Sequence, residues 1–218
     1  MKKSCLFCVF AVALSLYFLI SVSAVFAGDK TIIEEWSSIK TPQPPPLSSI
    51  VTADPSSTAL LMLDFNKQTC NIERRPRCIA SLPDVGKLLE TARANKLAVI
   101  HSISPGAAPA DIAAVVAPRD GEPVVQSGPD KFLGTDLEKI LNEKKIKTVV
   151  VVGTAAHGAV LYTASGAALR GLDVIVPVDG MSAEDLFAEH YVAWHLKNAP
   201  RIGAKTVLTK ISAISFVR

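Results

Sequence analysis

The sequence has few cysteines, few aromatic residues and no large excess of charge of either sign. Aromatic residues make up 6% of the chain, and its formal net charge is +3. Lys2 and Lys3 are the only charged residues in positions 1–27, so the remainder carries about +1. Proteins that bind nucleic acids through their phosphates present a basic surface. This charge balance argues against such an interface, and we expect no nucleic-acid partner.

Charge is also missing from positions 4–28, which form an apolar run directly after Lys2 and Lys3. The run ends in Val25-Phe26-Ala27, which has the small-residue spacing of a signal-peptidase site. We therefore interpret residues 1–27 as a signal peptide, which predicts an exported protein, periplasmic or secreted. The run is also long enough to cross a bilayer, so an uncleaved membrane anchor is the alternative. Later apolar runs are short and strand-like.

Residues 28–57 contain little that predicts a helix or a strand, and we interpret them as an extended leader. The segment at 41–46 reads TPQPPP and is typical of polyproline conformation. Residues 58–218 are expected to form one α/β domain.

The body of the chain alternates apolar runs with helical patterns. We expect strands over 58–65, 97–102, 147–153, 172–178 and 205–209, and helices over 84–95, 135–144, 159–170 and 182–197. Ser81, Thr135 and Ser182 are the expected helix-start residues. Between 105 and 125 we expect at most one short helix, at 111–116. The pattern predicts a three-layer, doubly wound, mostly parallel sheet with helices on both faces.

Two cysteines lie outside the apolar leading segment, Cys70 and Cys78, on either side of Arg74-Arg75-Pro76-Arg77. In an oxidising compartment a disulfide between them is the natural prediction, with free thiols as the alternative. The arginines are a candidate site for a carboxylate or, alternatively, a solvated loop.

Three segments carry the residues that we expect at the ligand site, because ligands bind at the carboxyl ends of strands in open α/β sheets. Asp64 ends the first buried strand, and Lys131 lies in the turn 127–132. The third segment, residues 153–160, is a small-residue turn from strand to helix, which we call the elbow. Taken singly, they have simpler interpretations: a strand-end cap, a solvated lysine and close helix–strand packing.

In this order, the acid, the lysine and the elbow resemble the isochorismatase-like hydrolase superfamily, which includes cysteine hydrolases such as nicotinamidase and N-carbamoylsarcosine amidase. The resemblance covers residues 58–215 and matches Asp64 and Lys131 to the family's acid and lysine. The family's elbow motif is Gly-x-x-x-x-x-Cys-Val-x-x-Thr-Ala, and here residues 153–164 read GTAAHGAVLYTA. Ala159 therefore stands at the position of the nucleophilic cysteine. The resemblance also implies a non-proline cis peptide bond at Thr154-Ala155.

The resemblance implies that the cysteine hydrolases form a thioester on this cysteine, and an alanine at position 159 cannot form one. The alternative is that Cys70 reaches the pocket as a free thiolate, which a disulfide with Cys78 would prevent. Isochorismatases of the same superfamily also lack the cysteine and have Ala-His in the elbow, as at Ala156-His157. The resemblance implies that such enzymes cleave a vinyl ether, with an Asp protonating the enol carbon. The sequence departs from the isochorismatases at two places that bear on which substrate fits. Residues 132–134 read FLG in place of their aromatic Trp-Arg-Tyr segment, and Asn66 replaces their usual Gln.

Two hypotheses follow for function. The first is a cysteine-independent hydrolase of a small anionic molecule, with Asp64 as general acid and Lys131 as its partner. The expected substrate-binding residues are Phe65, Asn66, Arg74, Arg75, Ala155, His157 and Gly158. Isochorismate itself is disfavoured because it belongs to cytoplasmic biosynthesis. The second hypothesis is an inactive pseudo-hydrolase that binds a small molecule or serves as an oligomeric scaffold.

Cofactors, metals and partners complete the expectations. His101, His157, His190 and His195 share no ligand spacing, so we expect no metal and no cofactor. The Pro-rich leader and the family resemblance predict a homo-oligomer, at least a dimer. Contact with a membrane is expected only if residues 1–27 are retained.

Overall fold

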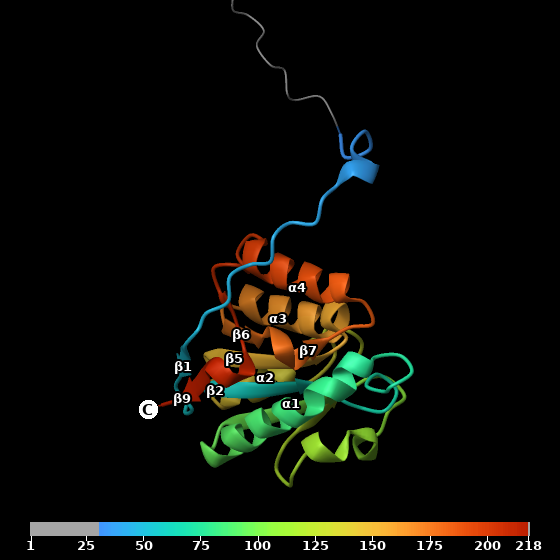
Figure 1. The fold of residues 1–218 in the computed structure, drawn as a ribbon. Coiled ribbons are helices and arrows are strands. Elements are labelled where there is room, and N and C mark those ends of the chain that lie inside the picture. Colours follow the sequence, from blue (N-terminus) through green and yellow to red (C-terminus); the bar gives the residue numbers. More distant parts are fainter. Residues whose placement is uncertain (1–30, 218) are drawn as a thin grey trace, which may run out of the picture. The chain divides into compact units, whose positions relative to one another are not determined.

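The computed structural model describes residues 31–217 (Figure 1). The interpreted signal peptide, with Cys5 and Cys8, lies outside the described residues. The chain divides into two units, Met1–Pro42 and Gln43–Arg218. The described part of the first unit contains one turn of 3-10 helix, Trp36–Ser38. None of the helices within residues 31–217 is long and apolar enough to cross a membrane.

The second unit is built on a seven-stranded parallel sheet with the order β4-β3-β2-β5-β6-β8, in which β7 also pairs with β5. A separate parallel pair joins β1 to β9. The strands are β1 (Val51–Ala53), β2 (Thr58–Leu63), β3 (Ala98–Ile103), β4 (Val124–Gln126), β5 (Thr148–Thr154), β6 (Asp173–Pro177), β7 (Met181–Ser182), β8 (Thr206–Thr209) and β9 (Ile214–Phe216).

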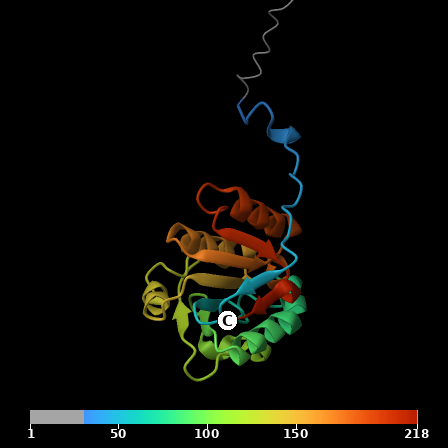
Figure 2. The ribbon, with the colours of Figure 1, turned by 90° about the vertical axis from the view of Figure 1, so that its left-hand side faces the viewer.

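Helices cover both faces of this sheet, so the unit has three layers (Figures 1 and 2). One core cluster joins the sheet to α2, α3 and α4, and a second joins it to α1 and to the β1–β9 pair. The helices are α1 (Pro76–Ala94), α2 (Leu137–Glu143), α3 (Leu161–Leu169) and α4 (Leu186–Asn198). The predicted fold class, a doubly wound sheet with helices on both faces, is confirmed.

The two central strands, β2 and β5, are mostly apolar because both of their faces are covered. Every residue of β2 is buried, and so are the last six residues of β5. From β2 the chain adds β3 and β4 on one side, then returns to place β5 on the other side. The order of strands therefore reverses between β2 and β5, and such a switch point is where open α/β sheets bind their ligands.

Several predicted boundaries are wrong for identifiable reasons. Helix α1 begins at Pro76, eight residues before the expected start, with proline at the position where a missing N–H costs least. Ser81 lies inside α1, where its hydroxyl donates to the carbonyl oxygen of Cys78. The N-cap of α4 is Asp185, which accepts from the amide of Phe187, and Ser182 belongs to β7.

Smaller differences lie elsewhere in the chain. Helix α2 begins at Leu137, two residues after Thr135, whose hydroxyl still accepts a hydrogen bond from the Leu137 amide. The expected single helix at 111–116 is two 3-10 turns, Pro109–Asp111 and Ala114–Val116. The strands β1, β4, β7 and β9 were not expected, because two or three residues are too few to give a periodic pattern.

Candidate functional site

Asp64 begins the loop at the carboxyl end of β2, at the switch point of the sheet. Its φ is +56°, a left-handed conformation that is uncommon for a residue other than glycine and that clusters at functional sites. Neighbouring strands hold it: its amide donates to the carbonyl oxygen of Ser102 at 3.1 Å. On the other side, a Cβ at Gly153 would lie 2.3 Å from the carbonyl oxygen of Leu63. Glycine therefore allows β5 to approach β2 directly beside Asp64.

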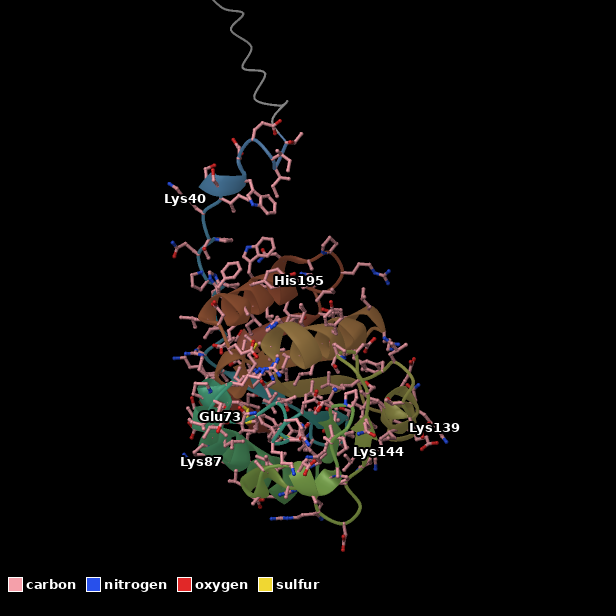
Figure 3. All side chains as sticks on the ribbon, turned by 90° about the vertical axis from the view of Figure 1, so that its right-hand side faces the viewer. Lys40, Glu73, Lys87, Lys139, Lys144 and His195 are labelled. Carbon is pink, nitrogen blue, oxygen red and sulfur yellow. A yellow bond between two sulfur atoms is a disulfide. The ribbon has the colours of Figure 1, made fainter. Side chains whose placement is uncertain are left out.

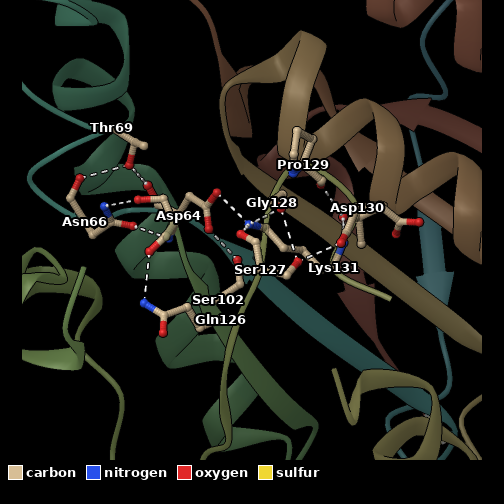
Figure 4. Close-up of polar contacts among 12 residues, drawn as sticks. Asp64, Asn66, Thr69, Ser102, Gln126, Ser127, Gly128, Pro129, Asp130 and Lys131 are labelled. Carbon is tan, nitrogen blue, oxygen red and sulfur yellow. Dashed lines mark hydrogen bonds and ion pairs between the residues drawn. The ribbon is translucent and has the colours of Figure 1, made fainter. Parts of the chain in front are cut away.

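The carboxylate of Asp64 contacts one hydroxyl and one ammonium group (Figure 4). The Ser102 hydroxyl donates to Oδ1 at 2.7 Å, and Lys131 Nζ donates to Oδ2 at 2.8 Å. Lys131 Nζ also donates to the carbonyl oxygens of Ser127 at 3.0 Å and Gly128 at 2.8 Å. An ammonium group has three protons. All three are therefore used within the protein, and the arrangement fixes the lysine on the aspartate.

This ion pair is removed from solvent. Lys131 is 0% exposed and Asp64 5% exposed, whereas Lys87, Lys139 and Lys144 lie on the surface (Figure 3). Burial raises the pKa of the Asp64 carboxyl above its ordinary value, and the charge of Lys131 and the hydrogen bonds from Lys131 and Ser102 partly oppose this rise. A buried carboxyl with a raised pKa beside a fixed cation is an arrangement suited to proton transfer.

The loop after β2 connects Asp64 to Arg75. The Thr69 hydroxyl donates to the carbonyl oxygen of Asp64 and to that of Asn66, the second at 3.0 Å (Figure 4). Arg75 Nη1 donates to the carbonyl oxygen of Thr69 at 2.9 Å. Desolvation lowers the pKa of Arg75, and the negative charges of Glu184 and Asp64 oppose this. Arg75 is thus within electrostatic range of the aspartate.

A disulfide between Cys70 and Cys78 closes the arginine loop, as predicted. Within it, Arg75 is 6% exposed, whereas the Arg74 side chain is 58% exposed. Both arginines contact Glu184, which follows β7: Arg74 Nε at 2.5 Å and Arg75 Nη2 at 3.3 Å. Arg77 binds Glu189 of α4 through two hydrogen bonds. The loop is therefore tied to α4 and to the segment that leads into it, while the side chains of Arg74 and Arg77 stay 58% and 48% exposed.

The elbow contributes shape and backbone groups to the site. The peptide bond between Thr154 and Ala155 is cis, at the bond that the resemblance indicated. Residues Ala156–Val160 form one turn of π-helix that leads into α3, and the carbonyl oxygen of Ala155 accepts from the amide of Gly158 at 3.0 Å. Ala159 is 3% exposed and belongs to the core cluster on the α3 side.

The structure brings some of the predicted residues together and separates others. Asp64 and Lys131 are in direct contact, and Arg75 is joined to them through the Thr69 loop. Phe65 is 2% exposed within the α1-side core, so its side chain serves packing. The Asn66 amide binds Ser104 and Gln68, an arrangement that shapes the loop. His157 is exposed, and Ala155 and Gly158 are half-buried.

Two contributors were missed by sequence reasoning. Ser102 stands opposite Leu63 in the β2–β3 register, so its hydroxyl lies beside Asp64. Pairing the expected strands from their carboxyl ends would have identified it. Glu184 lies more than 100 residues from Arg74 and Arg75 in the chain, and no local pattern connects them.

Within residues 31–217, no three His, Cys, Asp or Glu side chains gather in a way that would hold a metal ion. The Asp64 carboxylate binds the Ser102 hydroxyl and the Lys131 ammonium group, and the Arg75 guanidinium lies within electrostatic range of it. These two positive charges disfavour a metal ion there.

The fold and the site together define a parallel α/β protein with a buried acid–lysine pair at its switch point. A family model described as the isochorismatase domain matches residues 58–209. The secreted isochorismatase effector Isc1 of Verticillium dahliae is 33% identical over 147 residues, which cover 62% of this chain and 77% of the effector. The chain therefore belongs to the isochorismatase-like hydrolase family.

Solved structures share the same fold. An isochorismatase family protein from Desulfovibrio vulgaris has a TM-score of 0.65 at 20% identity, covering 72% of this chain and 95% of its own. An N-carbamoylsarcosine amidase from Thermoplasma acidophilum has a TM-score of 0.61 at 22% identity, covering 71% and 96%. At these identities, the likeness supports the fold alone.

Proposed function

We propose that the protein is a cysteine-independent hydrolase that cleaves a small, carboxylate-bearing vinyl ether, with Asp64 as the general acid. The observation that carries the proposal is the buried contact of Asp64 with Lys131 and Ser102 beside an elbow that has alanine at position 159. A binding scaffold has no need to bury an acid and a lysine together at the switch point.

The proposed reaction begins with proton transfer from the Asp64 carboxyl to the terminal carbon of the vinyl ether. The π electrons form the new C–H bond, and the ether carbon becomes an oxocarbenium ion. Water adds to this carbon and loses a proton to the Asp64 carboxylate. This last transfer regenerates the acid. The resulting hemiketal then breaks its ether C–O bond while its hydroxyl proton moves to the leaving oxygen, which releases a ketone and an alcohol.

In this proposal Lys131 and Ser102 are positioning residues. Their hydrogen bonds fix both carboxyl oxygens. Because the three ammonium protons of Lys131 are already used, its role is to stabilise the carboxylate left after proton transfer. The substrate's own negative charge is then assigned to another cation.

Isochorismate is the first substrate to test. The expected export of the chain argued against it, but the name of the Verticillium relative shows that an isochorismatase can be secreted. Purified protein incubated with isochorismate should release pyruvate, which a coupled dehydrogenase assay detects. No pyruvate above the rate in buffer, from a folded and disulfide-bonded sample, would contradict the proposed activity.

The second candidate is a binding protein without catalysis, favoured by the alanine at the nucleophile position. Calorimetry with isochorismate in buffers of different ionisation enthalpy separates the two hypotheses. A general acid should take up a proton when the anionic ligand binds, because the added negative charge favours the protonated Asp64. Binding without proton uptake and without turnover would favour the binding protein.

Export and assembly are further parts of the proposal. The secreted relative and the disulfide support export. Intact mass from the native host should show a chain that begins near Gly28 with both cysteines oxidised.

We also propose that the protein is a homo-oligomer. The large apolar side chains of Phe187, Tyr191 and Trp194 are exposed on α4 and support this assembly. Native mass spectrometry that shows only monomer at micromolar concentration would contradict assembly.

A further inference from the structure

Within residues 31–217, one edge of the Arg75 guanidinium lacks hydrogen-bond partners, although the side chain is buried. Nη1 donates to Thr69, and Nη2 lies 3.3 Å from Glu184 Oε1. Nε is buried and has no hydrogen-bond partner among the residues that the structure describes. A buried donor without a partner destabilises the fold by about 1–3 kcal/mol unless a ligand satisfies it. The Nε–Nη2 edge therefore has one unused donor and one long contact.

Two other arginines in the protein show how this edge is normally filled. Arg77 holds Glu189 through Nε at 2.7 Å and Nη2 at 2.6 Å. Arg93 holds Glu122 through the same two atoms, both at 2.7 Å. Planar two-point binding of this kind is the geometry in which a guanidinium recognises a carboxylate. Arg75 has the edge for it but only one long contact.

Glu184 supplies that one contact and is not firmly held by Arg75. The same oxygen, Oε1, lies 2.5 Å from Nε of Arg74, which is its nearer partner. The Glu184 side chain is 41% exposed, so it can turn toward solvent at little cost. Arg74, Arg75 and Arg77 share the two carboxylates of Glu184 and Glu189. The cluster therefore has one positive charge more than its acids neutralise.

We propose that Arg75 is the subsite for the substrate's carboxylate and that Glu184 is an internal carboxylate competing for it. A carboxylate that enters displaces Glu184 from Nη2 and binds Nε and Nη2 together. This inference rests on the proposed function, because the bound group lies within electrostatic range of Asp64. It also explains how the site takes an anion although Lys131 has no proton to offer. Arg74 keeps Glu184 nearby after the exchange.

The test uses pyruvate, the carboxylate that the proposed reaction releases, and the neutral pyruvamide as its control. The ¹⁵N NMR resonance of Arg75 Nε in the full chain should shift with pyruvate and not with pyruvamide. Glu184→Gln should raise pyruvate affinity about tenfold, because the competitor loses its charge. Arg75→Lys should lower it at least tenfold, since an ammonium group cannot offer the two-point edge.

Glu73→Gln is the matched control, because it removes an equal charge from an exposed position on the same loop (Figure 3). Its affinity for pyruvate should equal that of the unaltered protein. Equal affinity in Glu184→Gln and the unaltered protein, or an Arg75 Nε resonance that pyruvate leaves unmoved, would overturn the proposal. The NMR and affinity measurements record pyruvate binding and need no turnover. Loss of the proposed hydrolase activity would therefore leave this result standing, and the reverse also holds.

Discussion

The two sides of the switch point are built on opposite principles. The side at the end of β2, which we call the charged half, consists of Asp64, Ser102 and Lys131 with the carbonyl oxygens of Ser127 and Gly128. There, each charged atom has a partner between 2.7 and 3.0 Å. The elbow at the end of β5 has a cis peptide bond and a turn of π-helix, and it is made mostly of glycine and alanine, with Thr154, Val160 and the exposed His157.

This difference separates chemistry from shape. In a cysteine hydrolase, both sides of the site supply reactive groups. Here the charged half keeps its groups, and the elbow has a methyl group at position 159 in place of the thiol. Under the proposed function, the chemistry therefore depends on the charged half. The predictions below alter one side at a time.

Asp64→Asn is expected to have the largest effect. It removes the proton donor and should lower the rate of isochorismate hydrolysis by about 10³-fold, within the range for loss of a general acid. The measurement is kcat from pyruvate release. Asp84→Asn makes the same chemical change on the exposed face of α1 and should leave kcat unaltered. A rate within threefold of the unaltered enzyme would assign the acid to another group.

Lys131→Met should destabilise the fold by about 3–5 kcal/mol at pH 7, because it leaves the buried Asp64 charge without its ion pair. The folded-state pKa of Asp64 is raised by burial, so its contribution to stability is present at low pH and is lost as the pH rises through that pKa. Acidification protonates Asp64 and so removes the charge that the variant leaves unpaired. The difference in the free energy of unfolding between the variant and the unaltered protein should therefore shrink at low pH. Urea unfolding at several pH values measures it.

The control is Lys87→Met, which breaks an exposed pair with Asp84 and should cost less than about 1 kcal/mol at any pH. A deficit in Lys131→Met that does not change with pH would show that lost packing, rather than the unpaired charge of Asp64, is its cause.

Gly153→Ala tests the shape of the elbow. Its new Cβ would meet the backbone of Leu63, and φ at this position is +152°. We expect a loss of about 3 kcal/mol, comparable to the larger values for overpacking a core. Gly128→Ala is the matched control, because nothing lies within 4 Å of a Cβ there. Thermal unfolding of both variants measures this loss. An equal Tm in the two variants would show that β2 and β5 can move apart without loss of stability.

Ala159→Cys should have the smallest effect on the fold, about 1 kcal/mol, because it adds one sulfur atom to a buried position. The resemblance implies that the thiol would restore the family's Asp-Lys-Cys set. The start of α3 and Lys131 should lower its pKa, so it should react with iodoacetamide faster than a cysteine of equal burial elsewhere in the chain. A thiol that does not react would show that the elbow has moved away from the catalytic arrangement.

The sequence predicted the parts of the site whose signal is local. Asp64 closes an apolar strand, and Lys131 and the elbow follow it in a recognisable order. The sequence did not predict which side chains meet across neighbouring strands or between loops. Ser102 faces Asp64 only because β3 lies beside β2 in a particular register. Arg75 meets Glu184 only because the segment after β7 lies against the arginine loop. Phe65 shows the converse, since adjacency to Asp64 in the chain says nothing about which face a side chain occupies.

The burial of Lys131 also makes this residue a reporter of opening at the switch point. Reagents that acylate amines need an accessible nitrogen, and Lys87, Lys139 and Lys144 present theirs to solvent (Figure 3). Lys131 does not, because it is 0% exposed and its Nζ donates to three oxygens. Labelling of the native protein therefore maps its surface and spares the site. The first label on Lys131 marks the moment at which the switch point opens, and its rate gives the frequency of that opening.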